Sequence, residues 1–127
     1  MKSDAQSISF LQKVVDLTFR VLYHYVMKIV TYEILLSESE RKRHTHHTET
    51  GEVISFTVQF ETLVKNKWLP VVRYDTAHGY AHKDVLHLDG RKEKIDLGPL
   101  TLKDALVAAD RNINENWLRY KQRFLKE

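Results

Sequence analysis

The segment Glu52–Leu63 constrains the fold most, because polar and apolar residues alternate through most of its length. Successive side chains of a β-strand point to opposite faces, so this pattern predicts an antiparallel strand with one buried face and one polar face. A single apolar face must be covered by another layer. The residues predicted to point into the core are Ile54, Phe56, Val58 and Phe60.

A C-terminal helix is predicted to provide that layer. Gly98-Pro99 interrupts the preceding pattern, Thr101 is a suitable N-cap, and Asp104 follows it at the spacing of a capping box. The helix is predicted to run to about Leu125. Its apolar residues recur at three- and four-residue intervals and form one stripe, which comprises Leu102, Leu106, Ala109, Ile113, Trp117, Tyr120 and Phe124.

Further strands are predicted on both sides of the alternating segment. Asp89-Gly90 is a strong hairpin signal, and Pro70 places its strand near an edge or delays the start of its ladder. The polar run Ser37–Thr50 is predicted to contain a turn, and parts of 41–48 are predicted to pair as a strand with the segment that follows. The remaining predicted strands are 28–36, 68–75, 82–88 and 91–97.

A second helix is predicted at the N-terminus, over about Ser3–Tyr25, because its surface is apolar except for one polar line. The fold class is therefore α+β: an antiparallel meander sheet of about four to six strands with an N-terminal and a C-terminal helix packed on it. We expect a single domain, 1–127. Within it, 1–26 would be an oligomerisation or partner-binding helix and 27–127 the α+β core.

Composition excludes several classes of protein. The 127 residues include no cysteine, which excludes thiolate catalysis, zinc ribbons and disulfide scaffolds and fits a reducing compartment. The apolar stretch Leu17–Leu36 is interrupted by charged residues and is a poor membrane span. No signal-peptide pattern opens the chain. We therefore predict a cytoplasmic protein without a membrane partner.

A net charge of +3 favours polyanionic partners, although the excess of basic residues is small. The densest basic cluster is Arg41-Lys42-Arg43. These three residues are predicted to contact the phosphates of RNA. The alternative is that they form a solvated hairpin.

The segment Arg73–Asp84 concentrates the most reactive side chains. We expect His78 and His82 to act as general acid and base, with Asp75 orienting a histidine. Arg73 and Lys83 would hold a phosphate and stabilise developing charge. This set suits metal-independent RNA cleavage through the 2′-hydroxyl, and no cofactor is predicted.

Two alternatives to the catalytic interpretation remain. His78, His82 and Asp75 could ligate a metal ion together with a further histidine. Two histidines four residues apart indicate a metal site when both lie on one face of a helix, but Gly79 between them argues against a helix here. Otherwise these residues have only a structural role in the loop. We predict no metal site. The further histidines considered are His44, His46, His47 and His87.

Arg73-Tyr74-Asp75-Thr76-Ala77-His78-Gly79, followed by His82, resembles the Arg-Tyr-Asp-x-Ala-His-Gly-x-x-His core of a family of small uncharacterised prokaryotic proteins. The resemblance covers roughly 32–124. More distantly, an Arg-aromatic-Asp passage followed by histidines is similar to the endoribonuclease toxins of bacterial toxin–antitoxin pairs. That similarity implies RNA cleavage and a protein antitoxin as partner.

The leading functional hypothesis is therefore a small RNA-engaging protein that acts as a metal-independent endoribonuclease of toxin type. The alternative is a non-enzymatic interaction module that forms a homodimer through its apolar N-terminal helix.

Overall fold

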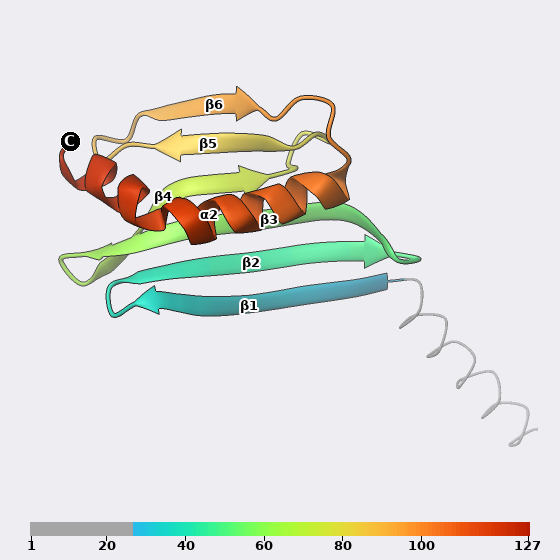
Figure 1. Cartoon of the computed structure of the whole chain (residues 1–127), viewed down its shortest axis with the longest axis horizontal. Coiled ribbons are helices and arrows are strands. Elements are labelled where there is room, and N and C mark those ends of the chain that lie inside the picture. Colours follow the sequence, from blue (N-terminus) through green and yellow to red (C-terminus); the bar gives the residue numbers. More distant parts are fainter. Residues whose placement is uncertain (1–26) are drawn as a thin grey trace, which may run out of the picture.

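The computed structural model describes residues 27–127, which form one antiparallel sheet and one helix (Figure 1). Six strands follow one another in the sheet in sequence order, so the topology is a meander. The elements are β1 Met27–Ser37, β2 Glu40–Glu49, β3 Glu52–Val64, β4 Lys67–Asp75, β5 His82–Leu86, β6 Lys92–Asp96 and α2 Leu102–Leu125.

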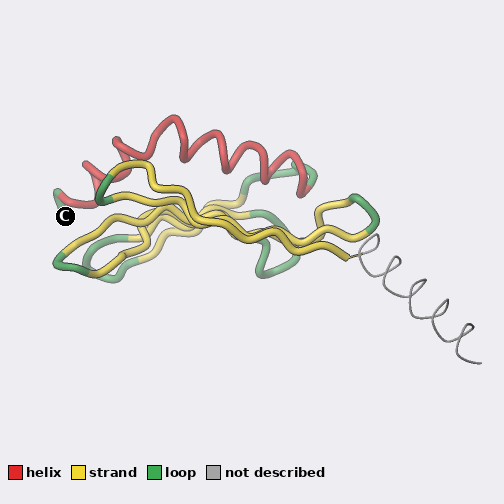
Figure 2. The backbone as a smooth tube through the Cα atoms, turned by 90° about the horizontal axis from the view of Figure 1, so that it is seen from below, coloured by secondary structure: helices red, strands yellow, loops and turns green. Residues whose placement is uncertain are grey.

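Helix α2 lies across one face of the sheet, which we call the covered face (Figure 2). Within residues 27–127, no helix lies over the opposite face, which we call the open face. Strand alternation and cross-strand register assign each side chain to one of these two faces. The central part of the open face is formed by Glu33, Arg41, Arg43, Thr45, Thr57, Gln59, Glu61, Arg73, Asp75, His82 and Asp84.

The core lies between β3, β4 and α2. Phe56, Val58 and Phe60 of β3 are buried on the covered face, against a helix stripe whose centre is the fully buried Ile113. The helix begins as predicted, since the Thr101 hydroxyl accepts a hydrogen bond from the Asp104 backbone N–H at 3.1 Å. The α+β class, the antiparallel meander and the C-terminal helix are confirmed.

One predicted core residue is wrong. Ile54 is 38% exposed because a bulge between His47 and Thr48 of β2 shifts the register. Val53 packs against the core in its place. The alternating pattern therefore holds from Phe56 onward but not at the start of β3.

The polar run 37–50 is more regular than predicted, because β2 is a full strand paired on both sides. Its helix-facing residues Lys42 and His44 are polar yet buried, so no apolar alternation marks the strand. Pro70 lies opposite Glu61 at a second register shift, and β5 pairs with β4 only from Val72 onward. The ladder between β4 and β5 therefore starts beyond the proline.

The predicted N-terminal helix, 3–25, lies outside the described residues. Among residues 27–127, no helix has the length and apolar character needed to cross a bilayer.

Candidate functional site

Three titratable side chains meet on the open face where β4 and β5 pair. Asp75 lies directly opposite His82, and Asp84 follows two residues later on the same face. His82 Nε2 lies 2.7 Å from Asp75 Oδ1 and 3.9 Å from Asp84 Oδ2. The two aspartates and the histidine thus form one cluster, which we call the Asp–His–Asp cluster.

This cluster is largely withdrawn from solvent. The His82 and Asp84 side chains are 2% and 3% exposed, whereas that of Asp75 is 14% exposed. Two of its buried polar atoms, His82 Nδ1 and Asp84 Oδ1, have no hydrogen-bond partner among the described residues. Buried polar atoms are normally paired, so the cluster has unused capacity to bind a ligand.

The loop between β4 and β5 covers His82. Gly79 adopts φ 82°, which favours glycine, and its N–H donates to the Thr76 carbonyl at 3.0 Å. The turn places the rings of His78 and Tyr80 beside His82, with centroid distances of 5.8 and 5.6 Å. Both rings are exposed, and Tyr80 retains 44% of its accessible surface.

Two shallow hollows continue from the cluster across the open face. One, of about 350 Å³, is lined by Asp75 together with Thr45 and Thr57. The other, of about 220 Å³, shares those two threonines and adds Arg43 and Gln59. We call these two hollows together the open-face groove.

Arg73 stands beside this groove. Its Nε donates to Gln59 Oε1 at 2.6 Å. No carboxylate among residues 27–127 lies within 4.0 Å of its guanidinium. Its positive charge is therefore not neutralised within the part of the chain that the structure describes.

Arg41 and Arg43 also lie on the open face but have acidic partners. Arg41 Nε lies 2.5 Å from Glu61, and its guanidinium stacks on the Trp68 ring at 4.3 Å. Arg43 pairs with Glu33 at 3.2 Å while remaining 52% exposed. Arg41 is held in place by these contacts, whereas Arg43 can still reach a ligand.

Lys42 and Lys83 lie on the covered face, away from the other predicted site residues. Lys42 Nζ contacts Asp110 at 2.7 Å and Asn114 at 2.8 Å. Lys83 Nζ donates to the Tyr120 hydroxyl at 2.9 Å. Both cations therefore support the packing of α2 and do not face the open-face groove.

The additional histidines considered as metal ligands are not brought to the cluster. His44 and His46 face α2, and their facing nitrogens are 2.6 Å apart. His87 lies at the other end of β5, where it contacts Glu93 and Glu127. The structure instead brings His82 close to Asp84, which was not among the predicted site residues.

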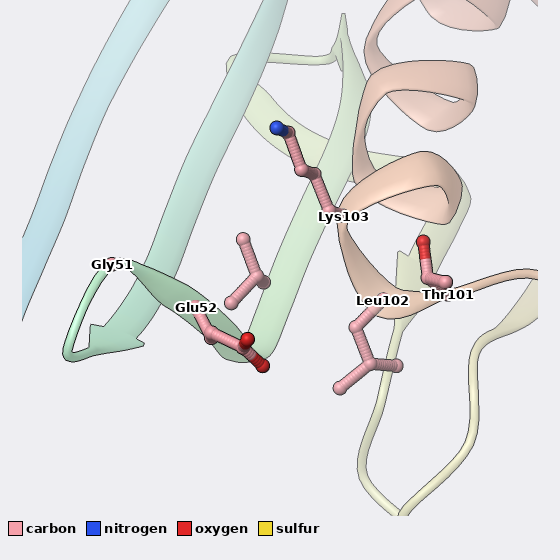
Figure 3. Close-up of a pocket in the computed structure, with 6 residues that line it drawn as sticks. Gly51, Glu52, Thr101, Leu102 and Lys103 are labelled. Carbon is pink, nitrogen blue, oxygen red and sulfur yellow. The ribbon is translucent and has the colours of Figure 1, made fainter.

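A third hollow, of about 520 Å³, lies between the β2–β3 turn and the start of α2 (Figure 3). Glu52 and Lys103 line it, but their charged ends point to different sides. It is lined by no histidine and by none of the three residues of the Asp–His–Asp cluster. We therefore place the candidate site on the open face.

Comparison with family models gives a match over residues 20–127 to a domain of unknown function, DUF7718. The chain belongs to the DUF7718 family. The match begins earlier than residue 32, where the expected resemblance starts, and it continues to the C-terminus. No curated protein and no solved structure matches the chain.

Membership in DUF7718 confirms the expectation of an uncharacterised family, and it assigns no activity to the chain. The comparisons give no support for similarity to toxin–antitoxin endoribonucleases. The features that bear on the function of this DUF7718 member are therefore those of its open face.

Proposed function

We propose that the protein binds single-stranded RNA across the open face of its sheet. The observation that carries the proposal is the Arg73 guanidinium, which lacks a carboxylate partner within the described residues and donates a hydrogen bond to Gln59, a residue that lines the open-face groove. Guanidinium groups recognise phosphate through paired N–H donors. Arg43, half-exposed at the same groove, is the second predicted phosphate contact.

The loop after β4 supports the choice of single-stranded RNA. His78 and Tyr80 present exposed rings on the same face as the groove. Bases of single strands are free to stack on such rings, whereas bases in a duplex are already stacked. Thr45, Thr57 and Gln59 supply neutral hydrogen-bonding groups between the cations and the rings.

Binding is better supported than cleavage. A general acid or base must lie within hydrogen-bonding reach of the substrate. His82 is 1% exposed, and Nδ1, the ring nitrogen that does not contact Asp75, is buried. The acid–base roles of His78 and His82 stay predictions, and the proposal is limited to RNA binding.

The test is fluorescence anisotropy with a labelled single-stranded RNA of about ten nucleotides. Arg73→Gln should weaken binding roughly tenfold, because a hydrogen bond to a charged group contributes about 1.5 kcal/mol. Tyr80→Ala should weaken it by a similar factor through lost stacking. Lys83→Gln removes the same charge from the other face of the same hairpin and is the matched control.

Equal loss of affinity in the Arg73 and Lys83 variants, with circular dichroism showing both folded, would contradict the proposal. Binding that is unaffected by Arg73→Gln would contradict it as well. The same RNA, run on a denaturing gel after incubation, measures cleavage directly. Shortened products that disappear in His78→Ala and His82→Ala would restore the catalytic interpretation.

A second candidate function is self-association through the edge strand β1. Strand β1 is paired only with β2 within the described residues, and it exposes large apolar side chains. Ile29 and Leu35 retain 64% and 70% of their accessible surface. Long edges of this kind are templates for strand pairing, here with a second copy of the chain.

Sedimentation of the full chain and of the double variant Ile29→Lys, Leu35→Lys tests this candidate. A dimer that becomes a monomer in the variant supports pairing through β1. A dimer that persists places the interface elsewhere, and the predicted N-terminal helix is then the next segment to remove.

A further inference from the structure

We propose that the Asp–His–Asp cluster binds one divalent metal ion, Mn²⁺ or Zn²⁺, through Asp75, His82 and Asp84. The inference goes beyond RNA binding and does not depend on it. It rests on the geometry of three donor groups, on an unpartnered buried oxygen and on the balance of charge at the cluster.

The donor atoms already lie close to the required arrangement. One ligand atom from each of Asp75, His82 and Asp84 falls within 4.8 Å of the other two. Donors bound about 2.1 Å from a common ion lie roughly 3.5 Å apart. Small side-chain rotations therefore suffice, and the positions come from two paired strands and not from a flexible loop.

The second, independent observation is Asp84. Its side chain is 3% exposed and points toward His82, yet Oδ1 has no hydrogen-bond partner among the described residues. A buried carboxylate oxygen without a partner is unfavourable, because burial has removed its water. Arg73 is the cross-strand neighbour of Asp84 but does not come within 4.0 Å of it.

The charge of the cluster also favours a cation. Two carboxylates face one imidazole, so the cluster is negative whether His82 is neutral or protonated. No Lys or Arg among residues 27–127 pairs with Asp75 or Asp84. A divalent ion would neutralise both carboxylates at once, and any proton carried by His82 Nε2 would be released to solvent when that nitrogen binds the metal.

The donor set narrows the identity of the ion. Calcium prefers six to eight oxygen donors, and magnesium prefers oxygen donors in an octahedron. Carboxylates suit Mn²⁺ and Zn²⁺, and imidazole suits Zn²⁺, so a set of two carboxylates and one imidazole fits either ion. Three protein donors leave positions for water, and Asp75 lines the hollow of about 350 Å³ through which ion and water can arrive.

The test uses the full chain, stripped with EDTA and exchanged into metal-free buffer without RNA. Calorimetric titration with MnCl₂, and separately with ZnCl₂, should give about one ion per chain. Asp84→Asn should weaken binding by at least tenfold, because even loss of a group that only supports a metal ligand typically costs about tenfold or more. His87→Gln is the control, because His87 with Glu93 and Glu127 is the competing surface group of similar composition.

A measurement on the unaltered chain keeps the proposal testable if Asp84→Asn does not fold. Paramagnetic Mn²⁺ should broaden the nuclear magnetic resonance signals of His82 and Thr76 before those of His87. Loss of binding in His87→Gln with retention in Asp84→Asn would overturn the proposal. Absence of binding at millimolar Mn²⁺ and Zn²⁺ would overturn it too, and would leave the cluster as a structural contact between His82 and its two aspartates.

Discussion

The two faces of the sheet use charged residues in different ways. On the covered face, Lys42 and Lys83 reach side chains of α2 and are neutralised or hydrogen-bonded by them. On the open face, Arg73 has no carboxylate partner and Asp84 retains an unpartnered oxygen within the described residues. The faces therefore differ in where unpaired charge remains within residues 27–127, although the open face also holds paired charges such as Arg41 with Glu61.

The largest effect is expected from Asp110→Ala on the covered face. It leaves the Lys42 ammonium, whose side chain is 2% exposed, without its carboxylate partner. Breaking a fully buried pair costs about 3 kcal/mol, and because the Asp110 side chain is itself 34% exposed, the expected loss is somewhat below that value. Urea unfolding followed by circular dichroism measures the loss. Glu115→Ala, an exposed position of the same helix, should change stability by less than about 0.5 kcal/mol.

If Asp110→Ala and Glu115→Ala lose equal stability, the covered face does not depend on its buried ion pair. The double variant Lys42→Met, Asp110→Ala should recover part of the loss, because it removes the stranded charge as well.

A slightly smaller effect is expected from Asn112→Ala. Asn112 Oδ1 accepts hydrogen bonds from the hydroxyls of Tyr74, at 2.6 Å, and Tyr120. Tyr74 is 4% exposed, so its hydroxyl cannot turn to water and would keep only the neighbouring Tyr120 hydroxyl as a partner. Loss of both hydrogen bonds to Asn112 should cost about 2 kcal/mol in the same unfolding experiment. Adding Tyr74→Phe should reduce that cost, and an unchanged cost would show that the hydroxyl was not stranded.

A pH effect is expected at His44, also on the covered face. Burial lowers the pKa of His44, and the neighbouring His46 and Lys42 lower it further against the opposing effect of Asp110. At His44 the unfolded chain therefore binds a proton more readily than the folded chain. The free energy of unfolding should fall as the pH falls through 6.5, the ordinary pKa of a histidine.

Unfolding of the wild type and of His44→Gln at pH 7.5 and pH 5.5 measures this contribution. The wild type should lose more stability between the two pH values than the variant. An identical loss in both proteins would show that His44 titrates alike in the folded and unfolded chains.

The smallest effect on stability is expected from Arg73→Gln, on the open face. The guanidinium has no carboxylate partner among residues 27–127, and glutamine can keep a hydrogen bond to Gln59. The free energy of unfolding should change by less than about 0.5 kcal/mol. A loss of more than about 1 kcal/mol in the free energy of unfolding would show that Arg73 stabilises the fold, as Lys42 does, and would contradict the contrast between the two faces.

The fold was predictable where the local pattern and the final environment agree. Phe56, Val58 and Phe60 alternate because that face of β3 is apolar, and Thr101 caps α2 through a contact three residues away. Strand β2 was not predictable in the same way. Its buried Lys42 is satisfied by Asn114, which is 72 residues distant in the chain, so no local pattern marks the strand.

The candidate site was predictable in part. Asp75 and His82, both predicted site residues, are in contact across the two strands, while the role of Asp75 in orienting a catalytic histidine stays a prediction. Strand alternation alone could have predicted that Lys83 and His82 lie on opposite faces of the sheet, since neighbours in a strand point opposite ways. The burial of Asp84 and the open-face groove could not be predicted, because both depend on how the β4–β5 loop and three strands meet.

The most direct test of the contrast between the faces is side-chain nuclear magnetic resonance during titration with single-stranded RNA. We predict shifts in the guanidinium signals of Arg73 and Arg43 and in the methyl signals of Thr45 and Thr57, with the methyl signal of Ala109 on α2 unchanged. Shifts centred on α2, or no shifts at RNA concentrations well above those of the protein, would contradict the assignment of the open face as the binding surface.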